Sequence, residues 1–239
     1  MTLPLSLRGV SRQFGRVHAV VDISLDIQPG TFVGLIGHNG AGKSTLLRMV
    51  SGVLRPSAGS IHIEDVDLFA DPYTARTHLG VVPEQPELFE YLTGREFLDF
   101  AAEVRGADNV EACLALTGLG EDADRQISEY SQGMRRKTAI AAALLGSPKL
   151  IVLDEAINGL DPPSAARVKS VLRSRVADGA SVLLSTHIVE TVEAVADRVV
   201  MMAHGRLVED VQASELPPGG LEQLFLERLA QAERSTPPA

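Results

Sequence analysis

The sequence predicts an α/β fold with a mixed or parallel sheet, an antiparallel β region at its N-terminus and an inserted α-helical region. Residues 3–36 hold short apolar runs broken by turn signals, which is typical of strands. Residues 94–145 carry apolar residues at helical spacing instead. From residue 150 onward, apolar runs of strand length alternate with helical segments, which indicates a sheet with crossover helices.

The first half contains strands, one early helix and then a helical stretch. LPLSLRGV, VHAVVDISLDI and TFVGLIG are predicted strands, and STLLRMVSGVL is the helix that follows them. SIHIEDVDLF alternates again and predicts a further strand. REFLDFAAEVRG places five apolar residues on one helix face, and NVEACLALTGLG and MRRKTAIAAALLG continue the helical pattern. Those five residues are Phe97, Leu98, Ala101, Ala102 and Val104.

The second half alternates strands and helices. LIVLD and SVLLSTH are predicted buried strands. PPSAARVKSVLRSRVADG is a predicted helix that starts at proline and ends at glycine. A further helix is expected in VETVEAVADR, then a hairpin in RVVMMAHGRLVED and a helix in GLEQLFLERLAQ, followed by a frayed ERSTPPA tail. The last helix has Leu221, Leu224, Phe225 and Leu229 at helical spacing, for packing on its own domain or against another subunit.

The composition fits an ordinary soluble globular protein, with 45% hydrophobic and 22% charged residues. A net charge of −9 argues against a general nucleic-acid binder. The single cysteine, Cys113, allows no intrachain disulfide and suits a reducing compartment. We find no secretory signal and no run of roughly 18 apolar residues, so we expect membrane contact only through a partner.

GHNGAGKS at 37–44 satisfies the phosphate-loop pattern G-x-x-x-x-G-K-[ST], directly after an apolar strand and before a helix. Gly37, Gly40 and Gly42 let the backbone wrap phosphate oxygens, which meet N–H groups and the positive end of the helix. Lys43 adds a cation for the β- and γ-phosphates, and the Ser44 hydroxyl is a ligand for Mg²⁺. The pattern predicts a P-loop NTPase core but does not separate kinases, GTPases and motor ATPases.

Two carboxylates end the strand LIVLDE, and a histidine ends the strand SVLLSTH. Asp154 is predicted to hold Mg²⁺, and Glu155 to act as the general base for an attacking water. Without the phosphate loop, the pair could equally cap the next segment. From the residues alone, His187 is either a satisfied strand-end histidine or a group that reaches the γ-phosphate.

The chain carries four motifs in the order GHNGAGKST, YSQGM, LIVLDE with GLDP, and STH. Together these motifs closely resemble the nucleotide-binding domain of ATP-binding cassette (ABC) transporters. The resemblance runs from near Leu5 to about residue 210, and YSQGM matches the family's signature, usually LSGGQ. It implies that two domains pair head to tail, so that the signature of one closes over the γ-phosphate held by the other. Ser131 would then donate to that phosphate, and the Gly133 backbone would approach it.

The resemblance also implies roles for other residues. Phe14 would stack on adenine, Asp161 would lie at the dimer seam, and His187 would be the switch histidine. The implied catalytic residues are Glu155, His187 and Lys43, and the implied magnesium ligands are Ser44, Asp154 and either Glu84 or Gln85. The implied ATP-binding residues are Phe14, Gly37, His38, Asn39, Gly40, Ala41, Gly42, Lys43, Ser44, Thr45, Ser131, Gly133 and Asp161.

Several positions depart from the family pattern. The glutamine that senses Mg²⁺ aligns with Glu84, while glutamine is next door at Gln85. Ala156 and Ile157 replace the usual Pro-Thr, and Gln132 and Met134 replace glycine and glutamine in the signature. The YS-x-GM form is similar to that of two-component exporters. Basic residues 135–137, on a helix flanked by AIAAALL, are either a solvated helix face, with some of them balancing phosphate charge across the dimer, or a nucleic-acid contact.

The sequence therefore predicts an ATPase domain over residues 1–210, with a helical subdomain at about 85–148 and a C-terminal helical extension over 211–239. The expected function is ATP hydrolysis, with Mg²⁺, that powers a separate transmembrane permease through ATP-driven dimerisation. The expected partners are that permease and a second ATPase subunit, here a homodimer, without nucleic acid. The expected location is cytoplasmic, at the inner face of the membrane. A nucleic-acid-processing ATPase is the rival, but its relatives carry two cassettes or a long coiled coil.

Overall fold

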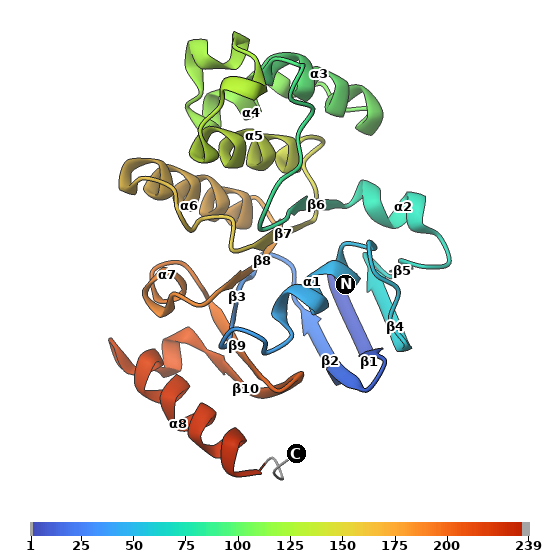
Figure 1. Ribbon diagram of the computed structural model, residues 1–239, viewed down its shortest axis with the longest axis vertical. Helices are drawn as coiled ribbons and strands as arrows, with labels where there is room; N and C mark the ends of the chain where they lie inside the picture. Colours follow the sequence, from blue (N-terminus) through green and yellow to red (C-terminus); the bar gives the residue numbers. More distant parts are fainter. Residues whose placement is uncertain (1, 236–239) are drawn as a thin grey trace.

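Two β-sheets form the centre of the protein, in a computed structural model that describes residues 2–235 (Figure 1). The smaller sheet is antiparallel, with the strand order β2(Val17–Ile27), β1(Leu5–Phe14), β4(Ala58–Ile63), β5(Val66–Asp67). The larger sheet has the order β10(Arg206–Gln212), β9(Arg198–Ala203), β3(Phe32–Ile36), β8(Ser181–Thr186), β7(Leu150–Asp154), β6(Leu79–Val82). Its strands run parallel except for β10, so the predicted α/β fold with a mixed sheet and an antiparallel N-terminal sheet is confirmed.

The helices divide into three groups around these sheets. Helix α1(Lys43–Val50) follows β3, and α2(Pro72–Thr77) leads into β6. Between residues 85 and 148 the structure contains only helical elements, α3(Gly94–Arg105), α4(Val110–Thr117), two short 3-10 turns and α5(Gln132–Leu144), gathered at one end of the molecule (Figure 1). Then come α6(Pro162–Ala177), α7(Val189–Glu193) and α8(Gly220–Ser235), the last at the opposite end.

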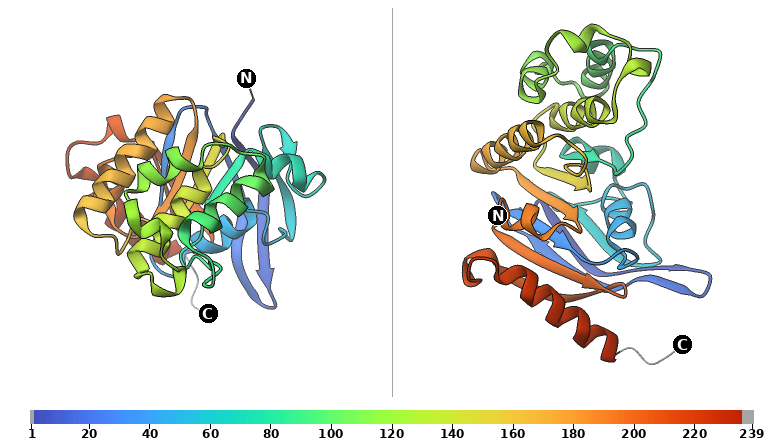
Figure 2. Two further views of the ribbon diagram at one scale, coloured as in Figure 1. Left: turned by 90° about the horizontal axis from the view of Figure 1, so that it is seen from above. Right: turned by 60° about the vertical axis from the view of Figure 1, so that its left-hand side comes forward.

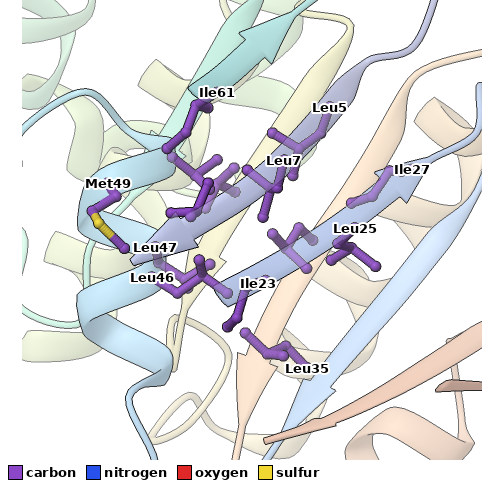
Figure 3. Close-up of a cluster of buried hydrophobic side chains, with 14 of the residues drawn as sticks. Leu5, Leu7, Ile23, Leu25, Ile27, Leu35, Leu46, Leu47, Met49 and Ile61 are labelled. Carbon is purple, nitrogen blue, oxygen red and sulfur yellow. The ribbon is translucent and has the colours of Figure 1, made fainter. Parts of the chain in front are cut away.

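Alternation along the buried strands gives the large sheet two apolar faces. On β7, Leu150 and Val152 face the antiparallel sheet and α1, whereas Ile151 and Leu153 face the helical side. Figure 3 shows the first of these clusters, in which Leu5, Ile23 and Leu46 come from β1, β2 and α1. The large sheet is therefore a covered central layer, which explains why its strands read as continuous apolar runs.

Four details differ from the sequence predictions. Val104 was placed on the buried face of its helix but is 67% exposed, because the helix buries Leu98 and Ala102 instead. The segment SIHIEDVDLF is two strands, since Glu64 and Asp65 both adopt positive φ at a turn between them. Helix α7 ends at Glu193, earlier than predicted, and α2 and β6 were not predicted at all.

The C-terminal helix packs on its own chain. Leu221 is 1% exposed and lies in a cluster with β9, which Leu224 and Phe225 flank. The helix continues to Ser235, so the first residues of the predicted frayed tail are helical, and residues 236–239 lie outside the described part of the chain. Residue 210, the predicted end of the ATPase domain, falls inside β10.

Candidate functional site

The predicted phosphate loop joins the end of β3 to the first turn of α1. Gly42 has φ +104, and a Cβ there would meet the carbonyl oxygen of Ala19, so only glycine fits. Lys43 folds back into the loop, where its ammonium donates to the carbonyls of Gly37 at 2.7 Å and His38 at 3.3 Å. The backbone of the loop thus provides acceptors for the Lys43 ammonium. Burial lowers the pKa of Lys43, while nearby carboxylates oppose that shift.

Asp154 ends β7 beside the loop, because β3, β8 and β7 are parallel neighbours whose carboxyl ends meet at one edge. Its carboxylate is 7% exposed. It accepts hydrogen bonds from the Ser185 hydroxyl at 2.5 Å and the Ser44 hydroxyl at 3.3 Å. Two strand ends and the loop therefore converge on one carboxylate.

Glu155, the next residue, turns back at φ +50, which directs its side chain into the same edge of the sheet. Its side chain is 13% exposed, and its carboxylate lies 3.1 Å from Nδ1 of His187. The amide of Asn158 donates to the same carboxylate and, at 3.3 Å, to the Thr186 hydroxyl. Glu155 is thus held by groups that follow both β7 and β8.

A cavity of about 590 Å³ opens over these residues, and we call it the loop cavity. Ten of the predicted site residues line it, and all of them are in the phosphate loop, after β6 or at the ends of β7 and β8. They are Asn39, Gly40, Ala41, Gly42, Lys43, Ser44, Thr45, Glu84, Glu155 and His187. The remaining lining residues are Val17, His18, Ala19, Arg136, Asn158, His204 and Gly205.

The structure separates Glu84 from Gln85. Glu84 lines the loop cavity, and its charge acts on Lys43. Both residues also line a second cavity of about 300 Å³, which Asp154 borders as well. Of the two candidates for the glutamine position, only Glu84 therefore faces both cavities.

Phe14 does not line the loop cavity. It ends β1 at the tip of the β1–β2 hairpin, opposite Val17, and this hairpin projects from the body of the protein (Figure 2). The ring is 46% exposed, and the guanidinium of Arg12 lies 4.6 Å from its centroid. One face of the ring is thus covered by a cation.

Ser131, Gly133 and Asp161 also lie outside the loop cavity. Ser131 is exposed at the N-cap of α5, where its hydroxyl accepts from the backbone of Met134 at 3.2 Å. Asp161 caps α6, accepting from the Ser164 hydroxyl at 2.7 Å and the Ser164 backbone at 2.9 Å. These bonds lower the pKa of Asp161. Within one chain, neither signature residue lines the cavity over the phosphate loop.

Sequence reasoning missed two residues of this site, and it considered a third, Arg136, only as one of three basic residues. Ser185 and Asn158 position the two carboxylates, and Arg136 reaches the loop cavity from the helical region. A signal existed for Ser185, since a polar residue in the buried strand SVLLST needs a partner. For Arg136 the contact depends on how α5 sits against the loop after β7, and for Asn158 it depends on the turn that follows Glu155 and on the approach of Thr186 from β8, neither of which the sequence indicates.

An apolar groove of about 440 Å³ lies between the helical region and the large sheet, and we call it the aromatic groove. Phe97, Phe100 and Val104 of α3 line it, with Phe89 from the preceding loop. Phe89 packs against Phe97 and Phe100 at ring distances of 6.0 and 5.7 Å, and both Phe89 and Phe100 stay about half exposed. Exposed apolar patches of this kind mark interaction sites.

Two absences hold for the described residues. Between residues 2 and 235, no helix has the length and apolar character needed to cross a membrane. In the same part of the chain, no three His, Cys, Asp or Glu side chains are grouped so that they could hold a metal ion by themselves.

Comparisons with known proteins identify relatives. The family model for ABC transporters matches residues 20–158. The bacitracin transport ATP-binding protein BcrA of Enterococcus faecalis is 34% identical over 221 residues, covering 90% of this chain and 71% of that protein. The daunorubicin/doxorubicin resistance ATP-binding protein DrrA of Streptomyces peucetius is 33% identical over 221 residues, covering 90% and 67%. A solved ATP-binding subunit of an ABC transporter superposes with a TM-score of 0.88 at 31% identity, covering 95% of this chain and 99% of that one.

Proposed function

The chain belongs to the ABC transporter family as an ATP-binding subunit, and we propose that two copies hydrolyse ATP at shared sites to drive a separate membrane subunit. The observation that carries this proposal is a division within the site. Glu155, His187 and the phosphate loop share one cavity, whereas Ser131 stands exposed outside it.

ATP binding starts at the glycine-rich loop. The backbone N–H groups of the loop and the N-terminus of α1 face the phosphates, and Lys43 exchanges its carbonyl partners for phosphate oxygens. Residues 17–19 and 204–205 also line the cavity, and Val17 pairs with Phe14 across the β1–β2 hairpin. Phe14 offers a ring face to adenine from the hairpin tip, and Arg12 backs that ring.

Hydrolysis needs a base next to the γ-phosphate. Glu155 accepts the proton of an attacking water, because its carboxylate lies in the loop cavity and is fixed by two neighbours. His187 orients that carboxylate from the adjacent strand end. The buried Lys43 balances charge that develops on the phosphate oxygens.

A magnesium ion fits the residues beside the loop. Mg²⁺ prefers hard oxygen ligands and keeps several waters, so one or two protein oxygens and the phosphates suffice. The hydroxyl of Ser44 and the carboxylate of Asp154 are such oxygens, 3.3 Å apart. Of Glu84 and Gln85, the two candidates for the position of the magnesium-sensing glutamine, Glu84 lines both cavities. The ion would neutralise phosphate charge during transfer.

The second half of each site comes from the other copy. Ser131 is exposed and caps α5, so its hydroxyl lies at the N-terminus of the helix, and both groups favour an anion. A second chain turned head to tail would bring a bound phosphate to this end. Asp161, exposed at the start of α6, is proposed to lie at the same seam.

The aromatic groove is the proposed docking site for the transmembrane subunit. It lies on the helical subdomain at about 85–148, next to the loop with Glu84 and Gln85 that borders the nucleotide site. Motion of this loop on ATP binding would therefore reach the partner. The relatives BcrA and DrrA are named for drug transport and resistance, which favours an exporter of the two-component kind at the cytoplasmic face of the membrane.

Two experiments test these assignments. Glu155→Gln should retain ATP binding and lower hydrolysis by roughly 10²–10⁴-fold, while the exposed control Glu190→Gln leaves both unchanged. Equal loss in both variants, or full activity in Glu155→Gln, would exclude Glu155 as the base.

Purification from detergent-solubilised membranes should bring down a stoichiometric polytopic subunit. Phe100→Asp in the groove should weaken this association, and Leu226→Asp, which is exposed on α8 at the other end of the molecule, should not. Recovery of RNA or DNA in place of a membrane subunit would support the nucleic-acid ATPase instead.

A further inference from the structure

Three successive cations follow the signature on α5, and the structure gives each a different environment. Arg135 forms an ion pair with Glu90 at 2.8 Å and is 17% exposed. Lys137 contributes to lowering the pKa of Asp161. Arg136 alone of the three lines the loop cavity.

Arg136 contacts the segment that follows the proposed base. Its guanidinium Nη1 donates to the carbonyl oxygen of Asn158. A Cβ on Gly159 would collide with the same nitrogen, so the backbone here is built for close approach of the guanidinium. Among the described residues, no carboxylate lies within ion-pair distance of Arg136.

Asn158 connects this contact to the base. Its backbone N–H donates to the carbonyl of Glu155 at 3.1 Å, and its side-chain amide donates to the Glu155 carboxylate. The amide also contacts the Thr186 hydroxyl, which caps the backbone of Ile188 beside the switch histidine. One residue thus links Arg136 to the reacting carboxylate.

We propose that Arg136 is a positioning residue that holds Asn158, and through it Glu155, and so ties α5 to the base of its own chain. The inference rests on the proposed role of Glu155. Arg136 lies five residues from Ser131, or about 7.5 Å along the helix. A helix that meets the partner's nucleotide at its N-cap therefore contacts the segment after its own chain's base about 1.4 turns later. Through Arg136, contact of Ser131 with the partner's nucleotide affects the position of Glu155 in the site of its own chain.

Arg136 could act in a different way, by contacting a phosphate directly, since its guanidinium faces the same cavity. The two roles differ in what they change. A positioning residue alters the turnover rate and acts only through Asn158. A phosphate ligand alters ATP affinity and acts without Asn158.

The test compares the full-length chain with five variants: Arg136→Ala, Arg136→Lys, Asn158→Ala, the Arg136→Ala/Asn158→Ala double variant, and Arg135→Ala as the matched control. For each, kcat, KM for ATP and thermal midpoint are measured. We expect Arg136→Ala to lower kcat on the order of tenfold with KM changed less than about twofold. Arg136→Lys restores much of kcat because an ammonium can still donate to the Asn158 carbonyl. Arg135→Ala keeps wild-type kcat.

The double variant decides between the two roles. If Arg136 acts through the side-chain amide of Asn158, which is the group that Asn158→Ala removes, the double variant turns over no more slowly than Asn158→Ala alone. Multiplied losses, a raised KM as the main effect, or an equal loss in Arg135→Ala would overturn the inference. Wild-type hydrolysis in the same assay tests the proposed function separately. Its absence overturns both proposals, whereas its presence with full activity in Arg136→Ala overturns this one alone.

Discussion

Two serines on β8 allow the contribution of the site to be separated from that of the fold. Ser185 and Ser181 are both fully buried. Ser185 donates to Asp154 at 2.5 Å and accepts from the backbone of Glu155 at 3.3 Å. Ser181 donates to the carbonyl of Gln28 at 2.9 Å and accepts from the backbone of Thr31 at 3.5 Å. Each hydroxyl therefore makes one donated and one accepted bond.

The substitutions Ser185→Ala and Ser181→Ala should cost similar stability. Leaving buried partners unsatisfied costs about 1–3 kcal/mol, and the thermal midpoint of a chain of this size falls roughly 2–4 °C per kcal/mol. Only Ser185 holds a proposed magnesium ligand. Loss of a group that orients a metal ligand typically costs about 10–100-fold in metal affinity or activity.

The assay is the initial rate of ATP hydrolysis as a function of Mg²⁺ concentration, at a temperature where both variants are folded. Ser185→Ala should require more Mg²⁺ or turn over about 10–100-fold more slowly, and Ser181→Ala should follow the wild type. Equal hydrolysis by the two variants at every Mg²⁺ concentration would refute the view that Ser185 sets the position of Asp154.

Three further predictions concern the loop, the signature and a helix cap. Gly42→Ala should reduce ATP affinity more than tenfold, because the new Cβ would collide with the carbonyl oxygen of Ala19. The control Gly179→Ala, also at positive φ but with open space around the Cβ, should retain ATP affinity. Equal ATP affinities in the two variants would count against the collision with Ala19. Ser131→Arg should leave ATP binding by the monomer unchanged and suppress hydrolysis; a loss of monomer affinity as large as that of Lys43→Ala would place the signature in its own site. Asp161→Ala should lower the thermal midpoint at pH 7. Because the pKa of Asp161 is lowered in the folded state, the difference in thermal midpoint between the variant and the wild type should disappear as the pH falls below about 3.8 and through the folded pKa. A difference in thermal midpoint that persists in acid would argue against the charged cap.

Much of the large sheet could be predicted because its central strands are buried on both faces. LIVLD and SVLLSTH read as apolar runs, and the structure makes them neighbouring parallel strands. The segment 72–82 was missed because a six-residue helix and a four-residue strand are too short for a periodic pattern. Val104 shows another limit, since helical spacing identifies an apolar face but not whether a neighbour covers all of it.

The candidate site divides in the same way. The phosphate loop and the acids after β7 could be found because their chemistry fixes residue types at fixed spacing. The contact between Arg136 and Asn158 could not, since a main-chain carbonyl accepts from any donor and no spacing rule joins α5 to the segment after β7. Ser131, Gly133 and Asp161 lie outside the loop cavity in a single chain, so their proposed roles depend on a second copy.

The central claim is that each nucleotide is completed by the signature of the other chain, and mixing two inactive variants tests it most directly. Ser131→Arg keeps a working loop but loses its signature, and Lys43→Ala keeps its signature but loses its loop. A mixed dimer has one complete site, so equimolar mixing should recover roughly a quarter of wild-type hydrolysis when chains pair at random and each site turns over on its own. If mixing recovers no activity from two folded variants, the signature does not act across the dimer and the account is wrong.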